Sequence, residues 1–373
     1  MIITLAFVNG FQHAVGDKVF NFWGHLRVQE YEPTKAMIAE ETPLPPSDTA
    51  LQILHLFPQV KQVQAFATKS AVIENDQEIE GVLFKGVESS YNFGNLKPFL
   101  KQGTFPDFKD SLYSKDILLS QPIANELKIK LNDTVNVYFI NQQEGKSSVR
   151  RLRVCGIFKT GIDEYDKLFA IGDIRVLRRV YNWEHNEIGG YEIFLNDYKK
   201  MDTINSQLYD MLPQAWISRT IKEIYPNIFD WLQIQDVNRN VIFIVMSIVA
   251  IINLVTCLLI LILERTRMVG VLKALGSRDW TIQQIFLYHA SIIAGIGVLI
   301  GLTAGLGICI LQQQTGFIKM NEAAYYVSEA PVYIIWWQVV GVCIATLLVC
   351  FLSLIIPTIF VKTISPVRAI QFR

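Results

Sequence analysis

The sequence has almost no cysteine outside its apolar segments, and this scarcity argues against two classes of site. Of the five cysteines, only Cys155 lies outside the long apolar runs, so the polar part of the chain has no partner for an internal disulfide. The sequence contains no CxxC or Cys/His spacing typical of a zinc site, and its five histidines are scattered. We therefore expect neither a disulfide scaffold nor a bound metal.

Surplus charge of one sign is also missing. The 34 lysines and arginines balance 34 aspartates and glutamates, which gives a formal net charge of +0. Nucleic-acid-binding proteins concentrate basic residues in a patch or stripe, and no basic stretch with interleaved aromatics occurs here. The sequence therefore predicts no nucleic-acid partner.

Catalytic signatures are absent as well. The tripeptide Gly145-Lys146-Ser147 lacks the glycine that a phosphate-binding P-loop requires five residues before Gly145, where Ile140 stands. No G-x-S-x-G, H-E-x-x-H or paired-carboxylate motif occurs. We predict that the chain is not an enzyme and that it has no catalytic residues and no cofactor of its own.

The last third of the sequence holds three long apolar runs, at 241–263, about 286–311 and about 333–361. Each reaches the roughly 20 residues that a helix needs to cross about 30 Å of hydrocarbon. Soluble helices rarely lack a polar face for so long. The sequence therefore predicts an α-helical membrane protein with three complete spans. The first two runs contain no Asp, Glu, Lys or Arg, which argues against a channel or an ion-coupled carrier.

Basic residues at the ends of the runs predict their orientation. The connection 312–332 contains a single basic residue, Lys319, whereas the loop after the first run and the C-terminal tail are rich in basic residues. These are Arg265, Arg267, Lys273 and Arg278 in the loop, and Lys362, Arg368 and Arg373 in the tail. Because cytoplasmic loops carry the excess of Lys and Arg, we expect the loop and the tail to be cytoplasmic. The connection 312–332 and everything before residue 240 should then lie outside.

Residues 13–237 have the composition of a soluble protein and predict a mixed α+β extracytoplasmic domain. Alternating patterns predict strands at 25–31 and 61–73, and further strands are predicted at 116–120, 134–140, 150–158 and 189–195. Helices are predicted within 45–57, 121–131, 198–212 and 221–240, and the last of these is interrupted at Pro226. The helix within 221–240 leads into the first apolar run. Residues 238–373 are therefore predicted to form the three-span domain.

The N-terminal residues MIITLAFVNGF are apolar but have no basic start, and they are too short for a signal peptide. Export of the large domain requires a preceding signal or span. We therefore expect residues 1–12 to be the end of a truncated first span. The alternative is a buried strand.

The segment 264–285 starts with the sequence ERTRMVGVLKALGSRDW and predicts a short amphipathic helix. Its apolar residues recur at i, i+3, i+4 and i+7: Met268, Val271, Leu272 and Leu275. Gly276 suits the end of this helix, and Ser277 or Asp279 suits the cap of the next. Such a helix either rests in the lipid interface or docks on a cytoplasmic partner, and the pattern by itself leaves both alternatives open.

In the second apolar run, Gly297, Gly301 and Gly305 recur every four residues. This spacing places small residues on one face of a helix, where another helix can approach closely. The alternative is that glycine is simply common in membrane helices.

Five segments resemble the FtsX-like/MacB-type ABC permeases. ERTRMVGVLKALGSRDWTIQQIF resembles the segment after the second span of that family, and PTIFVKTISPVRAIQFR resembles its C-terminal end. FVNGFQHAVGDKVFNFWGHLRVQ is similar to the exit from its first span, and DILLSQPIANELKIKLNDTVNVYFI to the core of its exported domain. The approach to the membrane, YPNIFDWLQIQDVNRN, most resembles the lipoprotein-release branch, LolC/LolE.

The resemblance implies four spans with a large exported domain between the first and the second. Two permease subunits, identical or different, pair with two copies of a separate cytoplasmic ATPase, which binds the ATP. The loop after the second span carries the helix that meets the ATPase. The residues implied in this coupling are Glu264, Arg265, Arg267, Met268, Val271, Leu272, Lys273, Leu275 and Gly276. The apolar ones are expected to supply buried contact, and the basic ones polar contact.

The function implied is coupling of ATP hydrolysis to the release of lipoproteins from the inner membrane. One alternative is MacB-like export of another amphiphile, such as a peptide, an antibiotic or a lipid. Another is FtsX-like regulation of a periplasmic cell-wall hydrolase. The resemblance also implies a periplasmic carrier that accepts the lipoprotein. However, the hairpin FINQQEGKSSVRRL is short and lacks the proline found in carrier-binding hairpins, which leaves the hand-off open.

Overall fold

The computed structural model describes residues 1–32, 40–76, 78–109, 112–141, 146–213 and 215–363. The chain divides into two compact units. The unit that we call the helical unit comprises Met1–His13, Asp230–Lys319 and Glu329–Arg373. The other, the sheet unit, comprises Ala14–Phe229 and Met320–Ser328.

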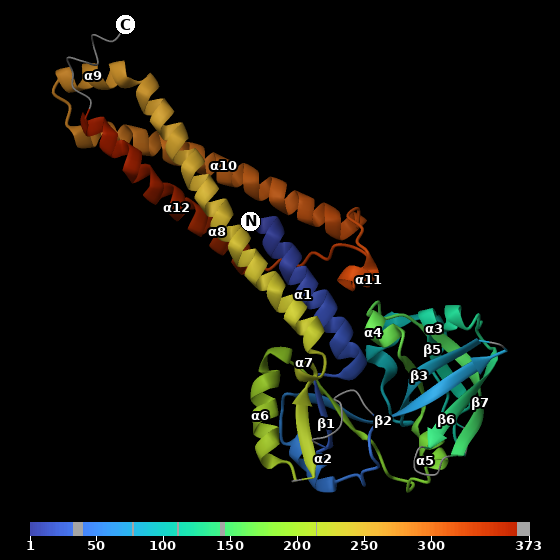
Figure 1. Ribbon diagram of the computed structural model, residues 1–373. Helices are drawn as coiled ribbons and strands as arrows, with labels where there is room; N and C mark the ends of the chain where they lie inside the picture. The colour runs from blue at the N-terminus through green and yellow to red at the C-terminus, as the bar shows by residue number, and fades with distance from the viewer. Residues whose placement is uncertain (33–39, 77, 110–111, 142–145, 214, 364–373) are drawn as a thin grey trace. The chain divides into compact units, whose positions relative to one another are not determined.

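The sheet unit is built on one ten-stranded sheet (Figure 1). Its strands are β1 (Leu26–Glu30), β2 (Val60–Asn75), β3 (Glu78–Val87), β4 (Leu100–Gly103), β5 (Asp116–Ser120), β6 (Thr134–Asn141), β7 (Lys146–Phe158), β8 (Phe169–Asp173), β9 (Gly190–Leu195) and β10 (Trp216–Thr220). The spatial order is β10-β1-β9-β2-β3-β8-β5-β7-β4, and β6 pairs with β2 and β7. The pairs β3–β8 and β5–β7 are parallel, and the remaining pairs are antiparallel.

The middle of this sheet is covered on both faces. Strands β5, β8 and β9 are buried along their whole length, which explains why their sequences show little polar alternation. Short helices supply part of the cover: α2 (Asp48–His55), α3 (Gln121–Glu126), α5 (Ile174–Val180), α6 (Met201–Met211) and α7 (Ile221–Ile224). The sheet unit also contains α4 (Asp163–Asp166) and α11 (Glu322–Tyr325). Several begin at side-chain caps that the sequence encodes, such as the capping box of Thr220 and Glu223 on α7.

Helix α1 (Ile2–Trp23) ends inside the core of the sheet unit. The Phe22 ring stacks on Tyr165 with 5.0 Å between ring centroids, and Trp23 meets Phe169 edge-on at 4.9 Å. Gly24 follows with a φ of 73°, a left-handed conformation that suits glycine after a helix end. The amide of His25 then donates to the carbonyl of Ile193, and the chain enters β1.

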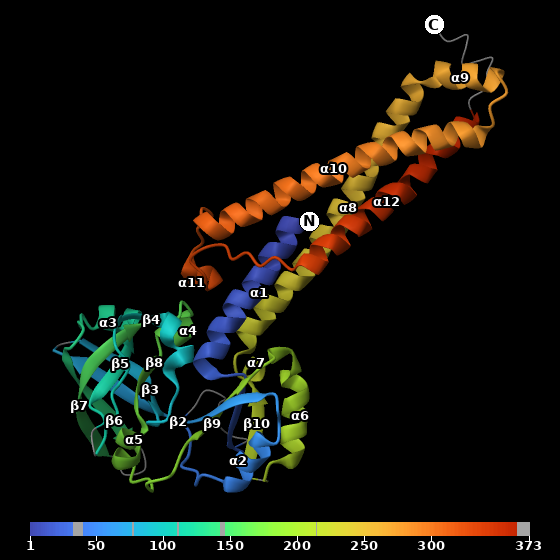
Figure 2. The ribbon, with the colours of Figure 1, turned by 180° about the vertical axis from the view of Figure 1, so that it is seen from behind.

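The helical unit contains α8 (Pro226–Glu264), α9 (Thr266–Ala274), α10 (Asp279–Thr315) and α12 (Trp336–Thr363), with α9 joining α8 to α10 (Figure 2). In the described part of the chain, α8 and α10 are long and apolar enough to cross a membrane. The described side chains of α12 give a shorter apolar stretch, Trp336–Leu352. The third complete span therefore stays a prediction.

The predicted elements of residues 13–240 are confirmed, including the helix break before Pro226. Residues 2–23 form a helix, so the alternative of an N-terminal strand is wrong. The elements that were not predicted from the sequence include β3, β8, β10, α4 and α5. The division into units falls at 13/14 and 229/230 and places residues 320–328 with the sheet unit. The proposed domain limits stay predictions.

Candidate functional site

The segment predicted to meet a cytoplasmic partner folds as the nine-residue helix α9. Its end is a Schellman motif: the amide of Gly276 donates to the carbonyl of Lys273, and that of Ser277 to the carbonyl of Leu272, both at 3.0 Å. Gly276 has a φ of 88°, which strongly favours glycine. Gly276 therefore ends this helix, as its place in the sequence predicted.

The predicted cap of the next helix is wrong. The N-cap residue of α10 is Arg278, and its side chain makes no capping hydrogen bond. Asp279 is the first residue of α10, and its carboxylate forms an ion pair with Lys273 of α9 at 3.0 Å. An acidic residue in the first turn is also favourable to the helix dipole. The ion pair thus joins α9 to the start of α10.

One face of α9 packs inside the helical unit. Val269 is fully buried in a cluster with Ile262 of α8 and with Ile282 and Phe286 of α10. Leu272 packs against the same cluster from its edge. This face therefore ties α9 to both long helices.

An adjacent apolar face of α9 is solvent-exposed in the single chain. Met268, Val271 and Leu275 expose 39%, 46% and 79% of their surface. They follow one another at spacings of three and four residues, so they share one side of the helix. The four apolar residues predicted to form one contact face are thus divided, because Leu272 packs inward while the other three face outward.

The polar residues of the segment divide in the same way. Glu264, Arg265 and Arg267 are exposed, whereas the side chain of Lys273 is only 10% exposed and is paired with Asp279. Arg267 precedes Val271 by four residues and therefore flanks the exposed apolar face. The outward surface of α9 is accordingly apolar with basic residues at its N-terminal end.

The glycines of α10 line an open apolar groove of about 550 Å³ in the helical unit. A Cβ atom added at Gly297 or Gly301 would meet nothing within 4 Å, and one at Gly305 would meet Ile2 at 3.6 Å. Of these three glycines, Gly305 alone has another described residue, Ile2, within 4 Å of its added Cβ atom. Close packing of a helix at Gly297 and Gly301 therefore stays a prediction.

A second candidate surface, which sequence reasoning missed, is a basic hollow of about 970 Å³ in the sheet unit. Its cationic residues come from the residue before β5, from β7 and from α5: Lys115, Arg150, Arg151, Arg153 and Arg179. Arg153 pairs with Asp116 at 2.7 Å. The other four form no ion pair with any carboxylate of the described residues. Exposed Leu112 and Val149 lie among them.

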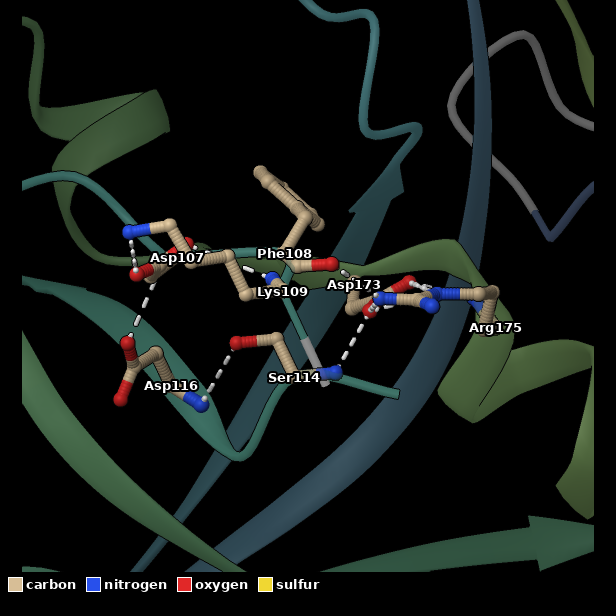
Figure 3. Close-up of polar contacts among 7 residues, drawn as sticks. All are labelled: Asp107, Phe108, Lys109, Ser114, Asp116, Asp173 and Arg175. Carbon is tan, nitrogen blue, oxygen red and sulfur yellow. Dashed lines mark hydrogen bonds and ion pairs between the residues drawn. The ribbon is translucent and has the colours of Figure 1, made fainter. Parts of the chain in front are cut away.

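Polar contacts fix the loop between β4 and β5 beside this hollow (Figure 3). The Asp173 carboxylate accepts hydrogen bonds from the Ser114 amide at 2.6 Å and from the Arg175 guanidinium. Ser114 Oγ accepts from the Asp116 amide, and Asp116 Oδ2 accepts from the Asp107 amide at 3.2 Å. These bonds position the loop residues that line the hollow. Its cations were missed because Lys115, the group at 150–153 and Arg179 are far from one another in the sequence, and the chain has no net charge.

Comparisons with known protein families cover almost the whole chain. The model of the MacB-like periplasmic core domain matches residues 1–208, and that of the FtsX-like permease C-terminal domain matches residues 240–366. The chain belongs to the MacB/FtsX-like permease family. It is accordingly a membrane permease with a mixed α/β periplasmic domain, and it is not an enzyme.

Curated relatives of this permease extend over its full length. The lipoprotein-releasing system transmembrane protein LolC of Xylella fastidiosa (strain Temecula1) is 19% identical over 100% of this chain and 90% of its own. LolE of Haemophilus influenzae is 22% identical with the same coverage. The solved periplasmic region of MacB from Actinobacillus actinomycetemcomitans matches 54% of this chain at 14% identity, with a TM-score of 0.38.

Proposed function

We propose that this permease is the transmembrane subunit of an ABC transporter of the inner membrane that releases lipoproteins. A separate cytoplasmic ATPase supplies the energy, and a second permease subunit, identical or different, completes the complex. The observation that carries this proposal is the similarity to LolC and LolE relatives over the whole chain. The apolar helices provide the membrane part, and the sheet unit provides the part outside.

The geometry of α9 supports its role as the helix that meets the ATPase. Its exposed face of Met268, Val271 and Leu275 offers apolar contact to a partner, while Val269 and Leu272 fasten the helix to α8 and α10. A close-packed cluster of this kind transmits displacement because interiors are dense and hardly compressible. A push on the outer face of α9 is therefore passed to both long helices.

Reconstitution tests the function. The full-length permease, its ATPase and any second permease subunit are placed in liposomes that contain a fluorescent triacylated lipoprotein. We expect ATP to release the lipoprotein into solution in the presence of an acceptor, and a non-hydrolysable ATP analogue to release none. Transport of another amphiphile while lipoprotein remains in the membrane would contradict the proposal. ATP-dependent activation of a cell-wall hydrolase without transport would contradict it as well.

We propose further that an acidic periplasmic carrier binds at the basic hollow. Four cations that pair with no carboxylate of the described residues attract acidic surfaces, and the exposed Leu112 and Val149 supply apolar contact. Arg151→Glu and Arg179→Glu should slow capture of the carrier from solution, with a stronger effect at low salt. Lys200→Glu, which makes the same charge change at an exposed site outside the hollow, is the control. If Arg151→Glu and Arg179→Glu captured the carrier as fast as Lys200→Glu, the basic hollow would be excluded as the carrier-binding site.

A further inference from the structure

Residues 320–328, which we call the tip, lie in the sequence between α10 and α12 but group with the sheet unit. The tip contains α11 and is closed at its base by the amide of Met320, which donates to the carbonyl of Ser328 at 2.9 Å. At the end of α11, the Tyr326 amide donates to the carbonyl of Glu322 at 2.8 Å. Tyr326 has a φ of 60°, which is uncommon for a residue other than glycine. The tip is therefore a closed and locally constrained loop.

Ion pairs from two separate elements of the sheet unit meet at one carboxylate of the tip. Glu322 pairs with Lys159, which follows β7, and with Lys18 of α1 at 3.9 Å. These three side chains expose only 22% to 34% of their surface. Partial burial makes such pairs stronger than fully exposed ones because solvent screens them less.

Hydrogen bonds extend the same contact to both ends of α11. Lys18 Nζ donates to the carbonyl oxygen of Tyr326 at 2.7 Å, and the Tyr326 hydroxyl donates to Glu164 of α4 at 3.2 Å. Gly161 has a φ of 77°, and a Cβ atom there would overlap Glu322 Oε1. The backbone beside the carboxylate thus leaves no room for a side chain. We conclude that the tip is fitted to this place on the sheet unit.

The connectivity gives this contact a mechanical consequence. Helix α8 includes residues of both units, so displacement of α8 reaches the sheet unit through a continuous helix. Helix α10 is also fastened to α9, and at its other end the chain runs directly into the tip, which groups with the sheet unit. The pairs of Glu322 thus anchor the segment that directly follows α10 to Lys18 and Lys159 of the sheet unit.

We propose that the tip is a tether through which α10 and α12 move the periplasmic sheet unit, with Glu322 as its positioning residue. This inference rests on the proposed function only in that an ATPase drives the movement. Lys18 and Lys159 hold Glu322, and the Tyr326 contacts orient α11 around it. The tether makes the sheet unit respond to both of the helices that α9 joins.

Hydrogen exchange of the full-length permease bound to its ATPase tests the attachment. Glu322→Gln removes the charge and keeps the shape, and it should raise amide exchange within 320–328 by about tenfold. The charge-exchanged variant Lys18→Glu/Lys159→Glu/Glu322→Lys should restore protection. The control is Lys167→Glu, a neighbouring exposed lysine that pairs with Asp163 of its own helix region. Unchanged exchange in Glu322→Gln would overturn the proposal.

The same samples test the transmission. ATP should change the exchange pattern of the sheet unit in the unaltered protein, and Glu322→Gln should reduce that change by about fivefold while ATP is still hydrolysed. A full ATP-dependent change despite a loosened tip would overturn the tether, as would the lack of any change in the unaltered protein. This measurement requires no transported substrate. A lost change in Glu322→Gln therefore supports the tether even where the lipoprotein assay fails.

Discussion

At the scale of single residues, the most consequential feature of the sheet unit is a fully buried ion pair. Lys85 of β3 and Glu192 of β9 lie 2.6 Å apart with no exposed side-chain surface. Lys85 Nζ also donates to the carbonyl oxygen of Phe22, in the last turn of α1, at 2.9 Å. Burial lowers the pKa of Lys85 and raises that of Glu192, and the opposite charge of the partner counteracts each shift. The pair therefore connects the end of α1 to two strands of the sheet.

Glu192→Leu should destabilise the sheet unit by about 3–5 kcal/mol because it leaves the Lys85 charge buried without a partner. The double variant Lys85→Met/Glu192→Leu should recover most of that loss, since it removes both charges. The measurement is chemical denaturation of the full-length protein in detergent, followed by tryptophan fluorescence. A double variant as unstable as the single one would show that the ion pair itself stabilises the fold.

His25 makes the stability of the sheet unit sensitive to acid. Burial, together with the charge of Lys61, lowers the pKa of His25 to about 4, and Nδ1 accepts a hydrogen bond from the Leu195 amide at 3.0 Å. Between pH 6.5 and 4 the unfolded chain binds this proton more readily than the folded one. The free energy of unfolding should therefore fall on acidification through this window, by up to about 3 kcal/mol, and level off above pH 6.5.

His25→Asn tests this contribution because the amide oxygen keeps an acceptor but does not titrate. Its midpoint of thermal unfolding should depend less on pH between 4.5 and 6.5 than that of the unaltered protein. Parallel pH profiles of the two proteins would show that His25 is not the cause.

At the scale of elements, α9 is an amphipathic helix with two apolar faces rather than one. The spacing of Met268, Val271, Leu272 and Leu275 predicted the helix but did not distinguish the residues that face α8 and α10. This distinction changes which substitution tests the contact with the ATPase. A charge at Leu272 disturbs packing inside the chain, whereas a charge at Val271 or Leu275 alters only the exposed surface.

Val271→Asp and Leu275→Asp should therefore abolish stimulation of the ATPase by the permease, without lowering the amount of folded protein in the membrane. Val269→Asp introduces a charge into the cluster and should instead reduce folded protein, as expected for a buried unpaired charge. ATP hydrolysis by the assembled complex and size-exclusion profiles of the permease are the two measurements. Undiminished stimulation in both exposed variants would show that this face does not contact the ATPase.

At the scale of the whole molecule, the permease joins a mixed α/β unit to a set of long apolar helices through α1 and α8. Both helices contain residues of both units, so each is a continuous covalent connection between them. The predicted function requires the sheet unit to lie outside the cytoplasm and α9 to lie inside it. Orientation is therefore the property on which the function of the whole chain depends.

Site-specific labelling checks this orientation in a cysteine-depleted protein. A membrane-impermeant maleimide should label Lys200→Cys, at an exposed site of the sheet unit, when only the outer membrane is opened. Ser277→Cys, between α9 and α10, should react only after the inner membrane is disrupted. Labelling of both positions under the first condition would contradict the predicted topology.

Much of the architecture could be predicted because it depends on local pattern. Apolar length indicated the two long helices α8 and α10, and the position of Pro226 indicated where α8 begins. The alternating sequences of 25–31 and 61–73 indicated strands β1 and β2. Buried strands such as β8 escaped prediction because a short apolar run does not distinguish strand from helix.

The class of the protein followed from the long apolar runs and the family resemblance, and helix α9 with its end at Gly276 followed from spacing within a few residues. Only the tertiary structure placed Leu272 against α8 and α10, gathered Arg151 and Arg179 at one hollow, and brought Glu322 to Lys18 and Lys159. Each of these contacts joins residues that are distant in the chain, and periodicity carries no information about such pairs. Folding brings them together because burial of the apolar surfaces between them fixes which faces meet.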